Sequence, residues 1–581
     1  MDPRDITAGY EIPSEHYADQ PYVVVTRDGN WLCVLTTGPS TESQQGQHVV
    51  AAISQDQGRS WSELIPIEPG LESADWHMTS WVTALAVPSG RVYAIYNYRD
   101  DEISTQHGGW LCYRYSDDNG RTWSGERYRI PMRLTKRDRE NVTGGTHQFF
   151  WCIDKPVTAN GSVYFALPKL TTGMPLDGGE GWVVHSDNIL TERDPAAIRW
   201  DLLPDGDVGV WNPALGSVQE EQNIEVLSDG SLYMVNRTEI GHPAYAISRD
   251  AGHTWTTPQV MRYATGNPLK NPRACPRIWK ASNGKFLFWF HNNGYPGWGN
   301  SAVRNPVWLA GGIEVDGDIR WSQPEILLYV PDPTVRGMSY PDFIEQDGRI
   351  WVTETEKVVA RVHPLDPALL DGLWNQHARA AVVQPGLALE SGPLGAGSSV
   401  ALPKLPSLRA GGFTLEMWLQ VGDLREGRTV LSSFGQRRYG FSVSLSADGA
   451  LRLNLADNRQ RQWLEVMDGP EPKENVRSVR QWSLSSGAGS ITPGKPHHAV
   501  FIVDGLAKIA SVVIDGVLYD GGASAIQGWC RLNPWLDDLN SDGVCVVDKG
   551  LPGQIARLRI YDRYLRTSEA ISNYRAGVAS Q

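Results

Sequence analysis

A tight glycine-containing turn between two β-rich segments recurs six times before residue 350. Each turn joins runs of apolar and β-branched residues, which is the sequence pattern of a β-hairpin. The six turns are RDGN at 27–30, PSGR at 88–91, ANGS at 159–162, SDGS at 228–231, SNGK at 282–285 and QDGR at 346–349. Their spacing leaves room for about four short strands in each repeat, so the sequence predicts an all-β fold that begins with a six-bladed β-propeller.

A second motif follows several of these hairpins and obeys the pattern S-x-D-x-G-x-[ST]-W. Its copies are SQDQGRSW at 54–61, SDDNGRTW at 116–123 and SRDAGHTW at 248–255. In such a turn the Asp side chain accepts backbone N–H groups, the Gly takes a positive φ, and the Trp packs beneath the turn. We therefore expect these aspartates to stabilise turns and to take no part in catalysis.

The composition changes after residue 362. Residues 363–384 are expected to form a linker with a short helix, so the propeller would span 1–362 and a second domain 385–581. Three segments of this second domain have the apolar and β-branched composition of long strands. They are GGFTLEMWLQV at 411–421, SVVIDGVLYDGG at 511–522 and GQIARLRIYDRYLRTSEAISNY at 553–574. The sequence therefore predicts a β-sandwich jelly roll as the second domain.

Net charge and composition narrow the possible partners. The formal net charge of −13 argues against nucleic acid and against a basic membrane-binding surface. The 23 tryptophans suit a protein that stacks indole rings on sugars. No signal sequence and no membrane-spanning apolar run is present, so we expect a cytoplasmic protein, or a secreted or periplasmic one if a leader has been removed. The oligomeric state is not indicated.

Cysteine and histidine spacing gives no metal motif. The six cysteines are scattered without a CxxC pair, and the histidines singled out below lack i,i+2 or i,i+4 spacing. Cys530 and Cys545 are close enough in the sequence for a loop disulfide, and free buried thiols fit equally well. We therefore expect neither a metal nor a cofactor.

The repeated Asp turns resemble those of sialidase-like (BNR or Asp-box) propellers, and the later strands resemble a laminin-G/concanavalin-like jelly roll. Large sialidases and trans-sialidases have a similar layout. The resemblance implies an exo-glycosidase that removes a terminal acidic sugar with a tyrosine nucleophile, a glutamate that activates it, an aspartate acid/base and three arginines that bind the sugar carboxylate. A neutral nucleophile suits an anomeric carbon that bears a negative group. The expected partner is thus a glycan or oligosaccharide.

The resemblance nominates particular residues for these roles. Tyr340, in SYPDF before the sixth turn, falls where the family has its nucleophile. VQEEQNIEVLSDGSLYMVNR at 218–237 nominates Glu221 as the activator, with Glu220 as the neighbouring alternative, and Arg237 as one carboxylate-binding arginine. Arg304 is the second arginine. Arg273 and Arg277 lie between prolines, and one of them, taken here as Arg277, is expected to face the same site.

Two departures from the family pattern concern the first repeat. Asp19 and Gln20 precede Pro21 where the family has an arginine, and the segment 36–50 offers Glu42 and His48 but no aspartate. His48 is therefore the candidate acid/base, since an imidazole titrates near neutral pH. His147 is a candidate substrate-binding residue. The set of histidines that the topology could bring together is His48, His77, His147 and His291.

Two other functions remain open at this point. Convergent histidine and tyrosine side chains would also suit a polysaccharide lyase that acts on uronate-containing glycans. Loss of the first-repeat arginine and of the family aspartate would suit a carbohydrate-binding protein without catalytic activity. We expect a sialidase-like glycoside hydrolase first, because Tyr340, Glu221, Arg237 and Arg304 are retained together.

Overall fold

A computed structural model describes residues 2–44, 46–68, 78–99, 107–172, 178–297, 301–332, 337–436, 439–457, 483–523 and 525–578. After the first two residues it divides into two compact units, one formed by residues 3–321 and 326–370 and the other by residues 322–325 and 371–581. The expected all-β class is confirmed, because α2 (Pro367–Trp374) and α4 (Thr567–Ala576) are the longest helices of the described residues. The shorter helices are η1 (Ile6–Ala8), α1 (Lys136–Arg139), η2 (Pro195–Ala197), η3 (Pro213–Leu215) and η4 (Ser301–Arg304).

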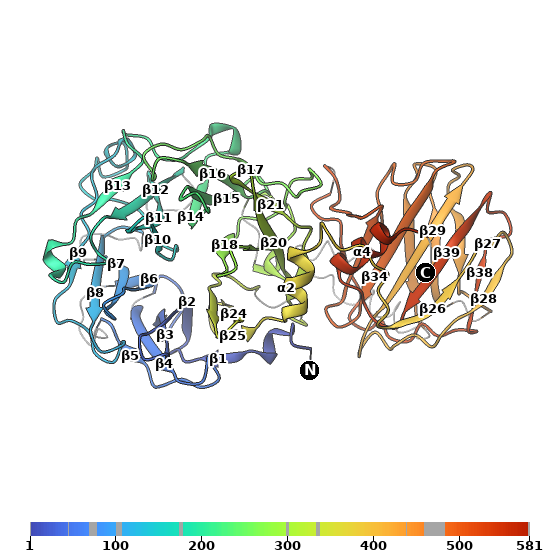
Figure 1. Cartoon of the computed structure of the whole chain (residues 1–581), viewed down its shortest axis with the longest axis horizontal. Helices are drawn as coiled ribbons and strands as arrows, with labels where there is room; N and C mark the ends of the chain where they lie inside the picture. Colours follow the sequence, from blue (N-terminus) through green and yellow to red (C-terminus); the bar gives the residue numbers. More distant parts are fainter. Residues whose placement is uncertain are drawn as a thin grey trace. The chain divides into compact units, whose positions relative to one another are not determined.

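The first unit contains six antiparallel sheets within its described residues, and Figure 1 shows them around a common centre. In five of them the strands follow one another in chain order, each joined to the next by a turn or loop. The first sheet consists of β2 (Tyr17–Val25), β3 (Trp31–Gly38), β4 (His48–Ser54) and β5 (Ile65–Pro66). The second consists of β6 (Met78–Ala86), β7 (Val92–Arg99), β8 (Trp110–Ser116) and β9 (Tyr128–Arg129).

The next three sheets repeat this order. The third is β10 (Val157–Ala159), β11 (Ser162–Leu170), β12 (Gly179–Ser186), β13 (Asp201–Leu203). The fourth is β14 (Gln219–Val226), β15 (Leu232–Thr238), β16 (Ala244–Ser248), β17 (Gln259–Val260). The fifth is β18 (Arg277–Lys280), β19 (Phe286–Phe290), β20 (Val307–Val315), β21 (Asp318–Trp321), with β22 (Glu325–Leu328) paired to β20.

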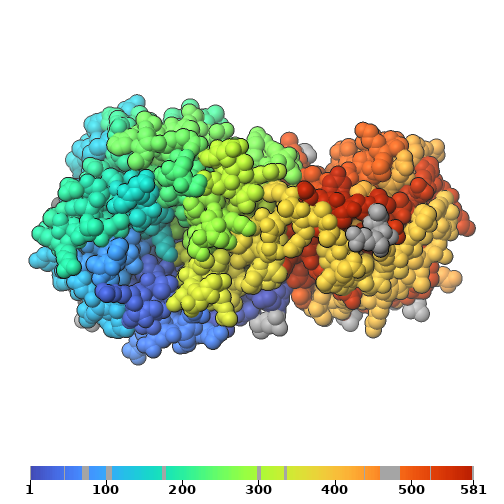
Figure 2. All heavy atoms as spheres, in the orientation of Figure 1, coloured from blue at the N-terminus to red at the C-terminus, as the bar shows by residue number. Residues whose placement is uncertain are grey.

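The sixth sheet joins the two ends of the unit. It runs β1-β25-β24-β23, so the N-terminal β1 (Tyr10–Ile12) pairs with the late β25 (Ala360–Pro364), next to β24 (Arg349–Thr355) and β23 (Phe343–Gln346). Such a pairing closes the ring and protects the outer edge of the last sheet. In the same orientation, Figure 2 shows that side chains cover most of the gaps that Figure 1 leaves between the ribbons of this unit.

The Asp turns have the hydrogen bonds that their residue types predict. In the first copy the Asp56 carboxylate accepts from the Ser60 backbone N–H at 2.9 Å and from the Ser60 hydroxyl at 2.6 Å. Gly58 has a φ of 85°, and the Trp61 indole donates to its carbonyl at 3.1 Å. Asp118 and Asp250 make the same pair of contacts to Thr122 and Thr254. These carboxylates are therefore occupied by their own turns.

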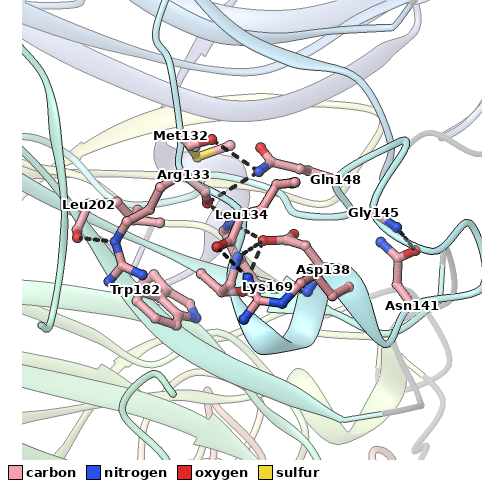
Figure 3. A network of polar contacts seen from close by, with 12 residues as sticks. Met132, Arg133, Leu134, Asp138, Asn141, Gly145, Gln148, Lys169, Trp182 and Leu202 are labelled. Carbon is pink, nitrogen blue, oxygen red and sulfur yellow. Dashed lines mark hydrogen bonds and ion pairs between the residues drawn. The ribbon is translucent and has the colours of Figure 1, made fainter. Parts of the chain in front are cut away.

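A buried lysine anchors the long connection between β9 and β10 (Figure 3). Lys169 on β11 is fully buried, pairs with Asp138 of α1 at 2.5 Å, and donates to the Arg133 carbonyl at 3.0 Å. Asp138 also accepts from the Thr135 backbone N–H and completes a capping box. This network fixes the segment that leads into Trp151, which lies in the central aromatic cluster described below.

The second unit is a β-sandwich of two sheets with one apolar core between them. The first sheet consists of β26 (Leu387–Ser391), β27 (Leu394–Gly395), β29 (Phe413–Val421), β34 (Pro496–Asp504), β35 (Ile509–Ile514), β36 (Val517–Leu518), β37 (Cys530–Arg531) and β39 (Gly553–Tyr561). The second consists of β28 (Ser399–Ala401), β30 (Arg428–Ser432), β31 (Gly440–Leu445), β32 (Leu451–Ala456), β33 (Ser483–Ser485) and β38 (Val544–Val547). Cys530 and Cys545 are buried free thiols, so the possible disulfide is not formed.

Candidate functional site

Four residues with left-handed backbone conformations occupy matched positions in four sheets of the first unit. Gln20, Trp81 and Glu221 each lie where the pairing of an innermost strand with its neighbour shifts register, and they have φ values of 52°, 54° and 49°. Tyr340 has a φ of 46° and precedes β23 of the sixth sheet. Non-glycine residues rarely adopt this conformation, and such strain concentrates at functional sites.

Tyr340 and Glu221 share a direct hydrogen bond. The Tyr340 phenol donates to Oε1 of Glu221 at 2.8 Å, and Arg237 binds the same carboxylate oxygen through Nη1 at 2.6 Å. All three side chains are at most 8% exposed. Glu221 is thus held between a phenol that donates to it and a guanidinium that pairs with it.

Three arginines surround this dyad. Arg237 also binds Glu220 at 2.5 Å, and Arg273 binds the same Glu220 oxygen at 2.7 Å. Arg304, in η4, is half-buried and donates to the Ser339 hydroxyl at 2.7 Å and to the Arg273 carbonyl at 3.2 Å. Within the described residues no acidic side chain forms an ion pair with Arg304, which is therefore the arginine of this group best able to accept a ligand anion.

A lysine covers one face of the Tyr340 ring. Nζ of Lys357 lies 4.3 Å from the ring centroid, 2.8 Å from Oδ2 of Asp19 and 3.2 Å from Oε1 of Glu42. The Tyr17 hydroxyl donates to the same Asp19 oxygen at 2.8 Å. Asp19 is fully buried, whereas the Glu42 side chain is 41% exposed. This part of the site therefore extends from a buried carboxylate to one in contact with solvent.

Aromatic side chains pack beside Tyr340. Trp81 and Trp151 belong to one buried apolar cluster with Tyr340, Phe149 and Cys275. The His107 ring stacks on Trp81 with centroids 5.3 Å apart and meets Trp151 edge-on at 5.1 Å. Trp81 and Trp151 are only 4% and 3% exposed, so these indole rings form part of the buried packing around Tyr340.

Burial and neighbouring charges shift the pKa values of several groups. Burial raises the pKa of the Tyr340 phenol well above its usual range, and the Glu221 carboxylate raises it further. Burial likewise raises the pKa of Glu220, against the effect of Arg237 and Arg273. Burial and the adjacent Arg237 lower the pKa of Arg273 to about 10. The neutral form of the Tyr340 phenol is thus favoured.

Arg277 lies elsewhere in the first unit, in a buried ionic network. Its guanidinium is 3.4 Å from the Asp154 carboxylate, 3.8 Å from the Asp342 carboxylate and 5.3 Å from the centroid of the Tyr22 ring. Of the two arginines between the prolines, Arg273 is the one that the structure brings to Glu220 and Arg304. The spacing of the two in the sequence gave no means of choosing between them.

The predicted histidines do not converge within the described residues. His48 contacts the Gly46 carbonyl at 2.8 Å and Glu15 at 3.4 Å, and His147 contacts the Thr146 hydroxyl at 3.3 Å. His291 is fully buried, and burial together with Arg304 lowers its pKa to about 3. His77 lies outside the described residues. In the described parts of the chain no three His, Cys, Asp or Glu side chains gather as a metal site.

Sequence reasoning missed several members of the site. Lys357 follows β24 as an ordinary turn lysine, and Trp81 and Trp151 have the pattern of core residues. In the sequence, Asp19 stands out only as the residue that replaces an arginine of the family pattern. Its position in the chain was the available signal. Asp19 directly precedes Gln20, just as Glu220 precedes Glu221 and Ser339 precedes Tyr340 in the other sheets.

Comparison with known proteins gives a family match within the second unit and several solved structures that are similar to the chain. Residues 394–571 match the family model described as the Concanavalin A-like lectin/glucanases superfamily. A structure of Trypanosoma rangeli sialidase in complex with sialic acid is 14% identical, with a TM-score of 0.43 and coverage of 99% of this chain and 97% of that one. A protein of unknown function from Dyadobacter fermentans is 13% identical, with a TM-score of 0.45 over 61% of this chain and 97% of that one.

The Hadza microbial sialidase Hz136 is 17% identical, with a TM-score of 0.43 over 60% of this chain and 66% of that one. No curated protein matches the chain. The resemblance of the later strands to a laminin-G/concanavalin-like domain is confirmed by the family model over residues 394–571. Within the described residues no helix is long and apolar enough to cross a membrane.

Proposed function

We propose that the chain is a retaining exo-glycosidase whose first unit, a six-bladed β-propeller, removes a terminal acidic sugar from a glycan. The observation that carries this proposal is the 2.8 Å hydrogen bond from the Tyr340 phenol to Glu221. A buried phenol bonded to a carboxylate is the arrangement that a tyrosine nucleophile requires. The half-buried Arg304, which donates to the Ser339 hydroxyl next to Tyr340, supplies a cation for the sugar carboxylate.

In the first step the Tyr340 oxygen attacks the anomeric carbon while Glu221 accepts the phenolic proton. The bond from the anomeric carbon to the leaving oxygen breaks, and that oxygen takes a proton from an acid. In the second step water attacks the same carbon and gives a proton to the acid that was deprotonated in the first step, the Tyr340–sugar bond breaks, and Glu221 returns its proton to the phenolate. Arg237 holds Glu221 in place throughout, because it binds the oxygen that faces Tyr340.

Glu42 is better placed than His48 to act as the acid. Both residues come from the same segment of the first repeat. The Glu42 side chain is 41% exposed, and Lys357 contacts both Glu42 and the Tyr340 ring. His48 is engaged by Glu15 and the Gly46 carbonyl. Although burial alone would raise the pKa of Glu42, Lys357 lowers it. The proposed role therefore requires Lys357 to release Glu42 when substrate binds.

The test compares the wild type with Tyr340→Phe on a panel of aryl glycosides of sugar acids and of neutral sugars. We expect the wild type to release the aryl group from an acidic member and Tyr340→Phe to be inactive, with unchanged unfolding behaviour. Turnover by Tyr340→Phe at a rate near that of the wild type would overturn the assignment. Growth of ultraviolet absorbance on a uronate-containing polysaccharide would indicate elimination and would assign a lyase instead.

The matched pair Glu42→Gln and His48→Gln identifies the acid. We expect Glu42→Gln to be strongly impaired on poor leaving groups, which need the acid, and to regain rate with added azide on good leaving groups, because azide attacks the sugar in place of water and needs no base. His48→Gln should remain near the wild-type rate. The reverse pattern would restore His48 to the acid role.

A further inference from the structure

We propose that His107 and Glu42 work as one proton-donating pair, in which His107 holds the proton that Glu42 delivers to the leaving oxygen. This inference rests on the proposed function and adds a residue to its mechanism. His107 acts on the reaction through Glu42, so it is a positioning residue and does not itself meet the reacting atoms.

Packing places the His107 imidazole beside the nucleophile. Its ring stacks on Trp81 with centroids 5.3 Å apart and meets Trp151 edge-on at 5.1 Å. Both indoles belong to the buried cluster that contains Tyr340. His107 is itself only 8% exposed, so its imidazole is fixed among these rings.

The backbone around His107 is held as firmly as its ring. The His107 carbonyl accepts from the Phe150 N–H at 2.8 Å. Gly109 has a φ of 136°, and a Cβ at this position would lie 2.2 Å from the Tyr98 carbonyl oxygen, so the chain next to His107 requires a glycine there. The imidazole is therefore preorganised and does not need to be placed by a ligand.

Glu42 and His107 lie in matching loops of adjacent sheets. Glu42 is in the loop between β3 and β4 of the first sheet, and His107 is in the loop between β7 and β8 of the second. The two sheets share one buried apolar core, so these loops leave the same end of neighbouring sheets. Nζ of Lys357 lies 3.2 Å from Oε1 of Glu42 and 4.3 Å from the centroid of the Tyr340 ring. Glu42 and His107 thus approach Tyr340 from two sides.

Neighbouring charges couple the two groups. Although burial alone would raise the pKa of Glu42, three basic side chains lower it, namely Lys357, Arg304 and His107. The interaction of two proton-binding groups is reciprocal, so the Glu42 carboxylate favours the protonated form of His107. A carboxyl group with a lowered pKa is a poor acid at neutral pH, whereas an imidazole titrates there. In the proposed resting state the pair therefore carries one proton, on His107.

Arg99 is a further charged residue near this loop. It ends β7, and its Cα would lie 3.1 Å from a Cβ at Gly109. Its guanidinium stays cationic throughout the pH range of an enzyme assay. Arg99 can therefore change the pH at which His107 titrates, but it takes no part in the transfer of the proton.

The proton follows a closed path through the two steps. As the bond from the anomeric carbon to the leaving oxygen breaks, that oxygen takes a proton from Glu42, and His107 passes its own proton to Glu42. The pair is then a neutral imidazole and an ionised carboxylate. In the second step the attacking water gives up a proton, which returns through Glu42 to His107 and restores the starting state.

The first test compares two leaving groups at two pH values. The wild type and His107→Gln are assayed on the 2,4-dinitrophenyl and phenyl glycosides of the acidic sugar, because dinitrophenolate leaves without an acid and phenolate needs one. At pH 7 we expect His107→Gln to lose about 10²-fold in kcat/KM on the phenyl glycoside and less than about 5-fold on the dinitrophenyl glycoside. The loss on the phenyl glycoside should shrink at pH 5, where Glu42 can take a proton from solvent.

A matched histidine variant serves as the control. His253→Gln removes an exposed histidine that pairs with Asp205, and it should behave like the wild type on both substrates. The inference is overturned if His107→Gln loses the same factor on both glycosides, if its loss does not change with pH, or if it retains the wild-type rate. Thermal unfolding of each variant shows that the protein is folded.

The second test does not depend on turnover. The imidazole Cε1–H resonance of His107, assigned by its absence in His107→Gln, is titrated in the wild type and in Glu42→Gln. We expect Glu42→Gln to lower the pKa of His107, because the carboxylate that favours the imidazolium is removed. Asp250→Asn, in a turn outside the site, should leave this titration unchanged. The same pKa in Glu42→Gln and the wild type would overturn the pairing.

Failure of the proposed function is read separately. It would appear as full turnover by Tyr340→Phe or as no turnover by the wild type, and neither observation alters the titration of His107. Conversely, a wild type that hydrolyses the acidic glycoside together with a fully active His107→Gln would leave the proposed function standing and would remove His107 from it.

Discussion

Glu221 and Tyr340 belong to different sheets, yet they adopt the same left-handed backbone conformation, with φ values of 49° and 46°, and their side chains meet at 2.8 Å. Each conformation costs of the order of 1–3 kcal/mol for a non-glycine residue. The surrounding strands must hold both residues in place. The strain therefore accompanies the contact that joins the Tyr340 phenol to the Glu221 carboxylate.

This contact predicts different outcomes for two adjacent glutamates. Glu221→Gln should lower kcat on an aryl glycoside by about 10²- to 10⁴-fold, because the amide cannot accept the phenolic proton. Glu220→Gln should lower kcat far less, because Glu220 contacts Arg237 and Arg273 but not the phenol. Steady-state kinetics on one substrate measures both. Equal losses of kcat in the two variants would show that Glu221 is not specifically the base.

Removal of Arg237 should destabilise the protein. In Arg237→Met the Glu221 carboxylate loses its only described cation and Glu220 loses one of two, so buried charge is left without compensation. We expect a loss of about 3–5 kcal/mol in the free energy of unfolding. Urea denaturation followed by tryptophan fluorescence measures it. Arg199→Met, which removes an exposed pair with Asp187, serves as the control and should leave the midpoint unchanged.

Acid should destabilise the protein partly through His291. Burial lowers the pKa of His291 to about 3, whereas a histidine in the unfolded chain titrates near 6.5. Between these values the unfolded chain binds a proton that the folded protein does not, so stability falls as pH decreases. From pH 7 to pH 5 this amounts to about 2 kcal/mol.

The variant His291→Gln isolates this contribution. Between pH 7 and pH 5 the wild type should lose about 2 kcal/mol more of its free energy of unfolding than His291→Gln does. All other titrating groups are common to the two proteins and cancel in the comparison. Parallel pH profiles would mean that His291 is protonated in the folded state.

The Asp turns should matter for stability and not for activity. Asp250→Ala removes the bonds to the backbone N–H and hydroxyl of Thr254, both at 2.9 Å or less. We expect a loss of about 1–2 kcal/mol in the free energy of unfolding. kcat/KM on the aryl glycoside should stay at the wild-type value when measured well below the unfolding temperature. A selective loss of activity would give the turn an unexpected role in the site.

Local patterns made much of the fold predictable. The hairpin turns and the S-x-D-x-G-x-[ST]-W boxes depend on contacts within a few residues, so their residue types predict them directly, as Asp56 and Ser60 illustrate. The alternation and β-branched content of segments such as 413–421 likewise indicate strands that pack in a sandwich. Tyr340 and Glu221 could be nominated only through the resemblance to sialidase-like propellers, which have a tyrosine and a glutamate at these points before a hairpin.

The remainder of the site depends on contacts between residues far apart in the sequence. Only closure of the ring brings Lys357 to Asp19, 338 positions away, and only the fifth sheet decides that Arg273, not Arg277, reaches Glu220. Nothing local separates His48, bound by Glu15, from a histidine free to act on a substrate. The sequence by itself thus determined the hairpins, the sandwich and the nucleophile candidate, because these follow from short-range patterns. The tertiary structure alone decided which charges share the space around Tyr340, because that depends on the register of six separate sheets.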